Sequence, residues 1–464
     1  MGASTALAAA SCGRGTGADA STRDLGVAFN DRVAEIVAGV VRPNVPARRF
    51  DAGDFGLSAG GDARPAINSA LAAANEAGGG RVVVPPGAYR SDGPIQLQSR
   101  CELHLSEGAK VTFSGDPTHY LPIVFTRWEG VEAYNYSPFI YGRGLSDVAI
   151  TGAGVFDGEG AANWLPMRPK QKADQTLLRE MGRTGVPLNE RRFGAGRWLR
   201  PHFLQIIDAE RVLIEGVTFL DSPFWVVHPV YCRHVTVRNI KVVSEHVNSD
   251  GVDPDSCEDV LIENCDFNTG DDGVAIKAGR DQDGWRVDRP CRRVVVRDCR
   301  YTGTAGGGMA IGSEMSGGVE EVFVDGYDMN EVKHGIYLKS NSDRGGYVRD
   351  CHFRRIAVAK AKDLIVVTNN YKEQGSGRYP ALFENVTFSG VRADTVETAI
   401  SIVGAPSIPV RGFTIADLRA RAAGLPLRTR NVEDLTFVNV SANGEAVDAV
   451  LETPPETHKN AAHY

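Results

Sequence analysis

Short apolar runs cut by glycine, asparagine and aspartate dominate the chain from Ile95 onward. One unit recurs, a short strand of alternating apolar residues closed by Asn, Asp or Gly, and it begins at Val148, Val212, Val235, Val260, Val294, Val322, Tyr347, Val386, Phe413 and Leu435. Roughly 23 to 34 residues separate the central units, a period typical of solenoids and arrays. The pattern therefore predicts one unit per coil and a stack of short parallel strands.

The Asn, Asp or Gly that closes each unit predicts how the coils bend. These residues tolerate the left-handed backbone conformation and suit a bend repeated from coil to coil. The fold class that follows is all-β, a right-handed parallel β-helix (solenoid) with an N-terminal helical cap. A propeller is the competing repeat architecture, but the chain lacks a four-strand blade pattern and its coils vary in length.

The remaining segments complete the predicted organisation. Apolar spacing predicts a helix over residues 22–41, expected to dock at one end of the core, and a second helix from Asp62 to about Ala77 that caps the first coil. The expected parts are a leader (1–22), an N-terminal cap (23–80), a β-helix catalytic domain (81–450) and a tail (451–464). An insertion at 161–200, helical around 171–181, is either a tolerated loop or a wall of the substrate cleft.

The first twenty residues resemble the end of a secretion signal, with Cys12 placed as in a bacterial lipoprotein cleavage site. No positively charged region precedes it, so the alternative is a flexible leader without function. The expected location is secreted or periplasmic, with a lipid anchor at Cys12 as one form of it. No later apolar run approaches the length of a membrane span.

Composition narrows the partners. The chain is 42% hydrophobic with a net charge of -7, which fits a globular protein and argues against a nucleic-acid partner. Its cysteines recur at equivalent places in successive units, Cys232, Cys257 and Cys291 in one register and Cys265, Cys299 and Cys351 in a second. With no CxxC pair or zinc spacing, free buried thiols in ladders are expected, and neither a metal nor a cofactor.

Two acidic clusters, residues 248–253 (NSDGVD) and 270–273 (GDDG), lie one repeat apart. If the repeats stack, the clusters meet on one face, and paired carboxylates in different environments are the equipment for glycosidic bond hydrolysis. Each cluster by itself is more typical of a turn than of a catalytic site. Asp253 and Asp255 are expected to be bend or supporting residues.

Here the sequence resembles the polygalacturonase-type glycoside hydrolases, glycoside hydrolase family 28, over nearly its whole length. The matching blocks are FDAGDFG (50–56), GGGRVVVPPGAY (78–89), Thr126–Gly130, Tyr134–Pro138, Ser222–His228, the two acidic clusters, Ile311–Gly318 and Lys339–Gly346. The resemblance implies a right-handed parallel β-helix and hydrolysis with inversion. By position, Asp271 is similar to the general acid, and Asp250 and Asp272 to the carboxylates that hold and deprotonate the water. An inverting arrangement predicts acid and base about 6.5–9.5 Å apart.

The chain departs from the family pattern at two places. Ala305-Gly306-Gly307-Gly308 stands where the family usually has Gly-His-Gly-Gly, so we assign the missing histidine to Gly306. Tyr337 stands where the family commonly has an arginine, while Lys339 is kept. Because an arginine fork binds a uronate carboxylate in two places, we expect the reaction to be kept and the substrate to differ from plain galacturonan.

Further residues are candidates for the substrate site, and each of them also has a possible structural role. Tyr337 is expected to stack on a sugar or to pack between strands, and Lys277 to bind an anion or to pair with a carboxylate. His334 and His246 are reserves for the missing histidine, or packing residues. Glu314 and Arg344 are cleft candidates or salt-bridge partners, and by the family block Arg127 and Trp128 line a sugar subsite, with core packing as the alternative for Trp128.

Three hypotheses follow. The first is an inverting hydrolase of α-linked pectic or related polysaccharides or oligosaccharides, with exo action favoured by the insertion. The second is a β-helix polysaccharide lyase, which typically needs Ca²⁺ and a Lys or Arg base. The third is a non-catalytic glycan-binding β-helix. Neither the sugar, the linkage nor the oligomeric state follows from the sequence.

Overall fold

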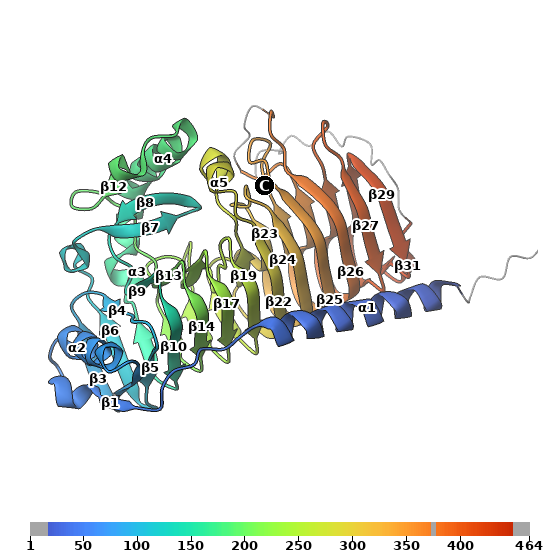
Figure 1. Cartoon of the computed structure of the whole chain (residues 1–464). Coiled ribbons are helices and arrows are strands. Elements are labelled where there is room, and N and C mark those ends of the chain that lie inside the picture. Colours follow the sequence, from blue (N-terminus) through green and yellow to red (C-terminus); the bar gives the residue numbers. More distant parts are fainter. Residues whose placement is uncertain (1–16, 373–376, 449–464) are drawn as a thin grey trace, which may run out of the picture.

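The computed structural model describes residues 17–372 and 377–448, with side chains from residue 26 onward. Its backbone is a right-handed parallel β-helix, as predicted. Figure 1 shows the coils stacked in chain order from the end near α2 to the end near β31. One apolar core runs through the coils from Ala52 to Ala442.

Three rows of parallel strands form the walls of the coil. The first row comprises β1 (Arg49–Asp51), β2 (Gly80–Val84), β5 (Cys101–Leu105), β10 (Ser146–Gly152), β14 (Glu210–Glu215), β17 (Arg233–Arg238), β19 (Glu258–Glu263), β22 (Cys291–Tyr301), β24 (Val319–Lys339), β25 (Tyr347–Thr368), β26 (Leu382–Val403), β27 (Val410–Ala416) and β29 (Val432–Val438). The second row has β3 (Gly87–Ser91), β6 (Ala109–Phe113), β11 (Val155–Asp157), β15 (Thr218–Leu220), β18 (Lys241–Ser244) and β20 (Asp266–Thr269). The third has β4 (Ile95–Gln96), β9 (Ile140–Arg143), β13 (Leu204–Ile207), β16 (Val227–Val230), β21 (Val274–Ile276) and β23 (Gly307–Gly312).

Toward the C-terminal end the rows merge. The long strands β24, β25 and β26 run from the first row through the bends into the third, so that β23 pairs with the last residues of β24. After β26 the stack continues through β28 (Arg419–Arg430) to β30 (Ser441–Ala442), which pairs with β31 (Glu445–Ala446) in an antiparallel arrangement.

The strand register confirms the repeat found in the sequence. Val148 pairs with Val212, and the same column continues through the units at Val235, Val260, Val294 and Val322. The closing Asn, Asp or Gly of these units has a positive φ, for example 54° at Asn239, 52° at Asn264 and 51° at Asp298. The bends therefore use the left-handed conformation, as expected for these residue types.

The prediction of free, buried cysteines is confirmed, but the predicted register is wrong for Cys351. The seven cysteines of the described residues are free and buried. Cys351, however, pairs with Val322, whereas Cys299 pairs with Tyr327. Cys351 therefore lies in the central valine column and not in the column of Cys265 and Cys299. Cys12 lies outside the described residues, as does the predicted tail from 451.

The helix that caps the first coil is α2 (Ala63–Glu76). The Asp62 side chain caps its first turn by accepting a hydrogen bond from the backbone of Arg64, which is a preferred N-cap arrangement. Its apolar face, which includes Ile67 and Leu71, is buried in the main core. The helix covers the open end of the stack, as a solenoid requires.

The first helix, α1 (Gly17–Gly39), forms where the pattern predicts it but docks elsewhere. It lies along the outside of the coils (Figure 1), not at an end. Phe29 and Ile36 contact Leu261, Val295 and Phe323, which stand in register on β19, β22 and β24. These outward-facing residues form an apolar stripe that water would otherwise cover, and burial of the stripe holds the helix in this position.

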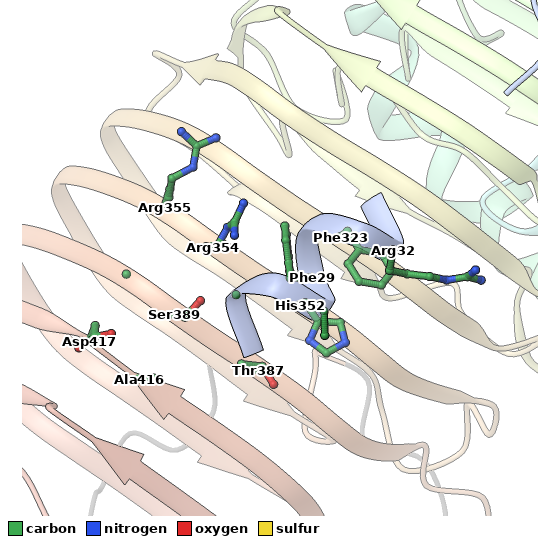
Figure 2. Close-up of a pocket in the computed structure, with 13 residues that line it drawn as sticks. Phe29, Arg32, Phe323, His352, Arg354, Arg355, Thr387, Ser389, Ala416 and Asp417 are labelled. Carbon is green, nitrogen blue, oxygen red and sulfur yellow. The ribbon is translucent and has the colours of Figure 1, made fainter. Parts of the chain in front are cut away.

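A hollow of about 430 Å³ opens beside α1 on this outer face. Figure 2 shows Phe29, Phe323 and His352 along it. The rings of Phe323 and His352 stack with centroids 5.0 Å apart. This hollow belongs to the docking of the helix, and the candidate chemistry lies on the third row of strands.

The insertion builds a small layer over that row. It contains α3 (Gly160–Asn163), α4 (Arg168–Thr184) and β12 (Arg192–Phe193), and β12 joins β8 (Val131–Asn135) and β7 (Val124–Trp128) in a three-stranded sheet. Leu178 and Phe193 pack with Trp128 and Phe224 in a separate apolar cluster. A further helix, α5 (Asp281–Val287), contacts α4 from the stack. Among the described residues, no helix is both long enough and apolar enough to cross a membrane.

We predict that Ile36→Ala loosens α1 from the stack. Ile36 is 3% exposed, and truncating a buried isoleucine lowers the free energy of unfolding by about 2 to 4 kcal/mol. Denaturant unfolding, with hydrogen exchange of the α1 amides, measures the loss. Val27→Ala on the same helix is the control, because Val27 is 59% exposed and its change should stay within about 0.5 kcal/mol. Equal effects of both variants would contradict the docking.

Candidate active site

A cleft of about 690 Å³ lies over the third row of strands, between the stack and α4. Its floor carries Asp250, Asp271, Asp272, Lys277 and Lys339, and further residues of the lining are Glu129, Arg168, Lys172, Trp225, Arg280, Glu314, Arg344, Tyr371 and Lys372. The three predicted catalytic carboxylates therefore share one cleft with four of the predicted substrate-binding residues, Lys277, Glu314, Lys339 and Arg344.

Stacking of adjacent coils brings the carboxylates together. The backbone of Gly251 donates to the carbonyl of Asp272 at 2.9 Å, and that of Gly273 donates to Gly307 at 2.9 Å. A Cβ on Gly251 would lie 2.5 Å from the carbonyl oxygen of Gly273, so the glycine after Asp250 is required for this close approach. The two acidic clusters are thus neighbours in the ladder.

The resulting spacing differs from the predicted one. One carboxylate oxygen each of Asp250, Asp271 and Asp272 can be chosen so that all three lie within 4.8 Å of one another. The expected separation of about 6.5–9.5 Å is therefore wrong for these oxygens. The reason is geometric, because neighbouring strands lie about 4.8 Å apart and the side chains extend from adjacent coils.

Lys339 fixes the charge of Asp272. Its Nζ lies 2.6 Å from Oδ2 of Asp272, and the backbone N–H of Gly307 donates to Oδ1 at 2.7 Å. Burial pushes the pKa of Asp272 upward, but the charges of Lys339 and Lys277 outweigh it and lower that pKa. Asp272 is therefore the ionised carboxylate of the pair.

Asp271 behaves in the opposite way. Burial raises its pKa, and the neighbouring charge of Asp272 raises it further. It is the less buried member of the pair, and the backbone N–H of Asn248 donates to its Oδ2 at 3.2 Å. Two adjacent carboxyl groups thus have pKa values pushed apart by their surroundings, which is the usual arrangement of an acid and a base.

Asp250 and Asp253 lie deeper in the floor. Burial raises the pKa of both well above the ordinary value, and for Asp250 the charge of Asp271 adds to the effect. Oδ1 of Asp250 and both oxygens of Asp253 accept no hydrogen bond. Burial thus raises the pKa of Asp250 and of Asp271 alike, and the two carboxyl groups act on each other through their charges.

Lys277 pairs with carboxylates, which was one of its two predicted roles. Its Nζ lies 3.2 Å from Oε2 of Glu314, 3.7 Å from Asp250 and 3.8 Å from Asp253. Arg280 approaches Oε1 of Glu314 to 2.8 Å. Burial raises the pKa of Glu314, but these cations outweigh it and hold that pKa well below its usual range. Glu314 and Arg344 line the cleft, and Arg344 pairs with Asp281 at 2.7 Å.

Tyr337, His334 and His246 support the floor and do not line the cleft. Tyr337 packs with Ala310 and Val366, and its ring centroid lies 4.3 Å from that of His334. His334 pairs with Asp363 at 3.0 Å, and burial lowers its pKa. His246 lies 2.7 Å from the carbonyl oxygen of Ser222. For these three residues the structure therefore agrees with the predicted alternative of a packing role.

The structure places both Arg127 and Trp128 in the interior. This corrects the predicted sugar-subsite role of Arg127, whereas Trp128 takes its predicted alternative, core packing. Both are 0% exposed. Arg127 forms an ion pair of 2.9 Å with Asp255, and Trp128 stacks on Phe224 with centroids 4.9 Å apart. The family block that contains them therefore fixes β7 to the stack.

The cleft also holds residues that the sequence did not single out. Glu129, Arg168, Lys172, Tyr371 and Lys372 line it. They come from the β7–β8 turn, from α4 and from the segment after β25, far apart in the chain. Glu129 lies inside the family block Thr126–Gly130, but no repeat or motif marks the other positions. Only the folded structure brings the set together at the cleft.

The carboxylate cluster is also the candidate for a cation. Among residues 17–372 and 377–448, Asp250, Asp271 and Asp272 are the group spaced to coordinate a metal ion. Lys339 and Lys277 already approach the same carboxylates with positive charge. The donor set is thus shared with two ammonium groups, which would oppose a cation.

The glycines near the acids differ in the space they leave. Gly306 has a φ of 73°, and a Cβ there would lie 2.5 Å from the carbonyl carbon of Asp271. A Cβ on Gly307 would lie 3.2 Å from Oδ1 of Asp272. The backbone thus leaves no room for a histidine at residue 306, the position assigned to it, and residue 307 is the more tolerant of the two.

Comparisons with known proteins match the part of the chain that carries the three carboxylates. The family model described as "Glycosyl hydrolases family 28" matches residues 194–442, which is more than half of the chain. A "Probable polygalacturonase" of Vitis vinifera is 29% identical over 377 residues, covering 77% of this chain and 71% of that protein. The crystal structure of a hyperthermoactive exopolygalacturonase from Thermotoga maritima is 37% identical, has a TM-score of 0.86 and covers 90% of this chain and 96% of that chain.

A more distant structure shows the fold alone. The polygalacturonase from Erwinia carotovora ssp. carotovora is 21% identical, with a TM-score of 0.62 over 87% of this chain and 98% of that chain.

The β-helix, the carboxylate cluster and these matches define the class, a glycoside hydrolase of the polygalacturonase type. Within that class, the chain belongs to glycosyl hydrolases family 28. The resemblance found in the sequence and its assignment as an enzyme are confirmed. Of the three hypotheses, the hydrolase is the one that the matches support.

We predict that Gly306→Ala and Gly307→Ala differ in activity. The first introduces a Cβ into the backbone of Asp271 and Asp272, and a misplacement of about 1 Å can cost roughly 100-fold in rate. The second requires only a small shift, and we expect less than about tenfold in kcat because the site can absorb it. Reducing-sugar assays on both purified variants, with circular dichroism as the folding check, measure this. Equal kcat values would contradict the argument.

Proposed function

We propose that this protein hydrolyses α-linked galacturonate chains with inversion at the anomeric carbon. The observation that carries the proposal is the Asp271–Asp272 pair, whose adjacent carboxyl groups have pKa values displaced in opposite directions. Asp271 acts as the general acid that protonates the leaving glycosidic oxygen. Asp250 and Asp272 hold the attacking water and take its proton.

The ionisation of the cluster supports these roles. In the productive form the proton lies on Asp271, which faces the cleft, and Asp272 is ionised beside Lys339. Both oxygens of Asp272 are engaged by Lys339 and Gly307, which suits a carboxylate that positions water rather than one that attacks the sugar.

The lining of the cleft supports a uronate substrate. The arginine absent at Tyr337 was the reason to expect a substrate other than galacturonan, but Arg280, Arg344 and Lys372 line the same cleft. These residues can therefore supply the positive charge for a sugar carboxylate that the missing arginine would have supplied. The names of the relatives, polygalacturonase and exopolygalacturonase, point to the same substrate class.

Exo action is part of the proposal. The insertion places α4 along one side of the cleft, and its residues from Arg168 to Arg179 contribute to the lining. A wall on this side restricts how a long polymer can cross the site. The relative with 37% identity is named an exopolygalacturonase.

Two further expectations belong to the same proposal. Residues 81–450 act as the catalytic domain, with residues 23–80 as its N-terminal cap and 161–200 as the cleft wall. The protein reaches its substrate outside the cytoplasm, in the secreted or periplasmic space, where long plant polysaccharides are met.

Product analysis tests the activity. We expect trigalacturonate to yield monogalacturonate and digalacturonate, with the β-anomer of the new reducing end appearing first in an NMR time course. Asp271→Asn should reduce kcat by at least about 100-fold, because general acid catalysis contributes that much. Undiminished release would remove Asp271 from the acid role, an α-anomer would contradict inversion, and an unsaturated product absorbing in the ultraviolet would indicate a lyase.

The pH profile tests the role of Lys339. Its ammonium lowers the pKa of Asp272, and Asp272 must be ionised to act. Lys339→Met removes that charge, so the pKa rises and the acidic limb of kcat/KM moves to higher pH by about 1 to 2 units. Lys372→Met is the control, since Lys372 lines the cleft without bonding Asp272. An unmoved limb in Lys339→Met would contradict the assignment.

A further inference from the structure

The first turns of α4 carry three cations where a helix disfavours them. Arg168, Lys170 and Lys172 lie at its N-terminus, and the first turn contains no acidic residue and no side-chain cap. The N-terminus of a helix is the positive end of its dipole, so cations there lower its stability. A sequence that breaks such a local rule without a structural gain indicates a functional reason.

Two of the three cations face the cleft and the third does not. Arg168 and Lys172 are four residues apart, which places them on the same face, and both line the cleft. Lys170 lies over the ring of Trp198, 4.0 Å from its centroid, and is not part of the lining. The helix therefore presents two of its three cations to the substrate side.

Arg168 and Lys172 lack the partners that other cations of the cleft have. Lys339 pairs with Asp272, and Lys277 and Arg280 pair with Glu314. Among the residues that the structure describes, neither Arg168 nor Lys172 forms an ion pair, and Lys172 bonds only the side-chain oxygen of Gln175 at 3.3 Å. Their charge is therefore available to an anion.

A chain of hydrogen bonds fixes this face relative to the catalytic acid. Gln171 lies between the two cations in sequence, and its Oε1 accepts from Nε of Arg200 at 2.9 Å. Arg200 donates to Oδ1 of Asn248 at 3.0 Å, and the backbone N–H of Asn248 donates to Asp271. Burial, and then the charge of nearby Arg168, lower the pKa of Arg200 to about 10.

We propose that Arg168 and Lys172 form a subsite that binds the carboxylate of a galacturonate unit next to the cleaved bond. The inference rests on the proposed function and names two specificity residues outside the repeats of the stack. An arginine and a lysine side by side suit one carboxylate, which the guanidinium can hold with two hydrogen bonds. A sugar without the carboxylate, or with a methyl ester in its place, loses this contact.

Kinetics on trigalacturonate test the subsite. Lys172→Gln and Arg168→Gln should each raise KM roughly fivefold, and the double variant more than tenfold, because partly exposed charge contacts are individually modest. The kcat value should stay within about twofold, as expected when ground-state and transition-state binding fall together. Rising salt should increase KM for the wild type and much less for the double variant.

Lys170→Gln is the matched control. It removes the same charge from the same helical turn, on the side away from the cleft, so KM should stay within about twofold. All three single variants should keep or raise the melting temperature, because each removes a cation from a helix N-terminus. A lower melting temperature together with a lost activity would instead indicate a structural role and overturn the proposal.

The substrate itself supplies the second arm of the test. Trigalacturonate with methyl-esterified carboxylates should bind more weakly to the wild type, whereas the double variant should distinguish the two forms less. Unchanged KM in the double variant, with an active wild type, overturns the subsite alone. If the wild type does not cleave trigalacturonate, and the Asp271→Asn variant does not bind it in calorimetry, both the subsite and the proposed function fail.

Discussion

The hydrogen-bond ladder between successive coils sets the distances on which the site depends. Each coil lies about 4.8 Å from the next, and side chains that leave equivalent positions must come within that range. Asp250 and Asp272 are brought together in this way, and so are Lys277 and Lys339, which are both in register with Gly312 on β23. The stack therefore concentrates charge that no single coil could hold.

Charge held so closely in a buried floor has to be compensated. An unpaired buried charge is costly, and the usual outcomes are pairing or a changed protonation state. Both occur here, since Asp272 and Glu314 are paired with lysines and stay ionised, whereas burial raises the pKa of Asp250 and Asp271. The difference between the neighbours Asp271 and Asp272 arises from Lys339, which contacts only the second of them.

The two long helices outside the stack, α1 and α4, have different roles. The contact of α1 is mainly apolar, against an outward stripe of three strands, and Arg32 adds a hydrogen bond to Glu321 of β24 at 3.1 Å. It stabilises the coils without reaching the cleft. The contact of α4 is both apolar and polar, with Leu178 in the cluster below and Gln171 bonded to Arg200. Its N-terminal turns carry positive charge, which is unfavourable at the positive end of the helix dipole. This cost in stability falls on the surface that faces the cleft.

The repeat, the class of fold and the candidate catalytic carboxylates could all be predicted from the sequence, because the period and the residue type at each bend are local properties. The sequence also predicted α2 and the presence of α1 and α4. The tertiary structure decided what depends on contacts between distant segments. It placed α1 on the outer face, buried Arg127 and Trp128, and brought Glu129, Lys172 and Tyr371 to the cleft. Side-chain partners that lie more than a hundred residues apart, such as Arg127 and Asp255, leave no periodic mark, so packing alone reveals them.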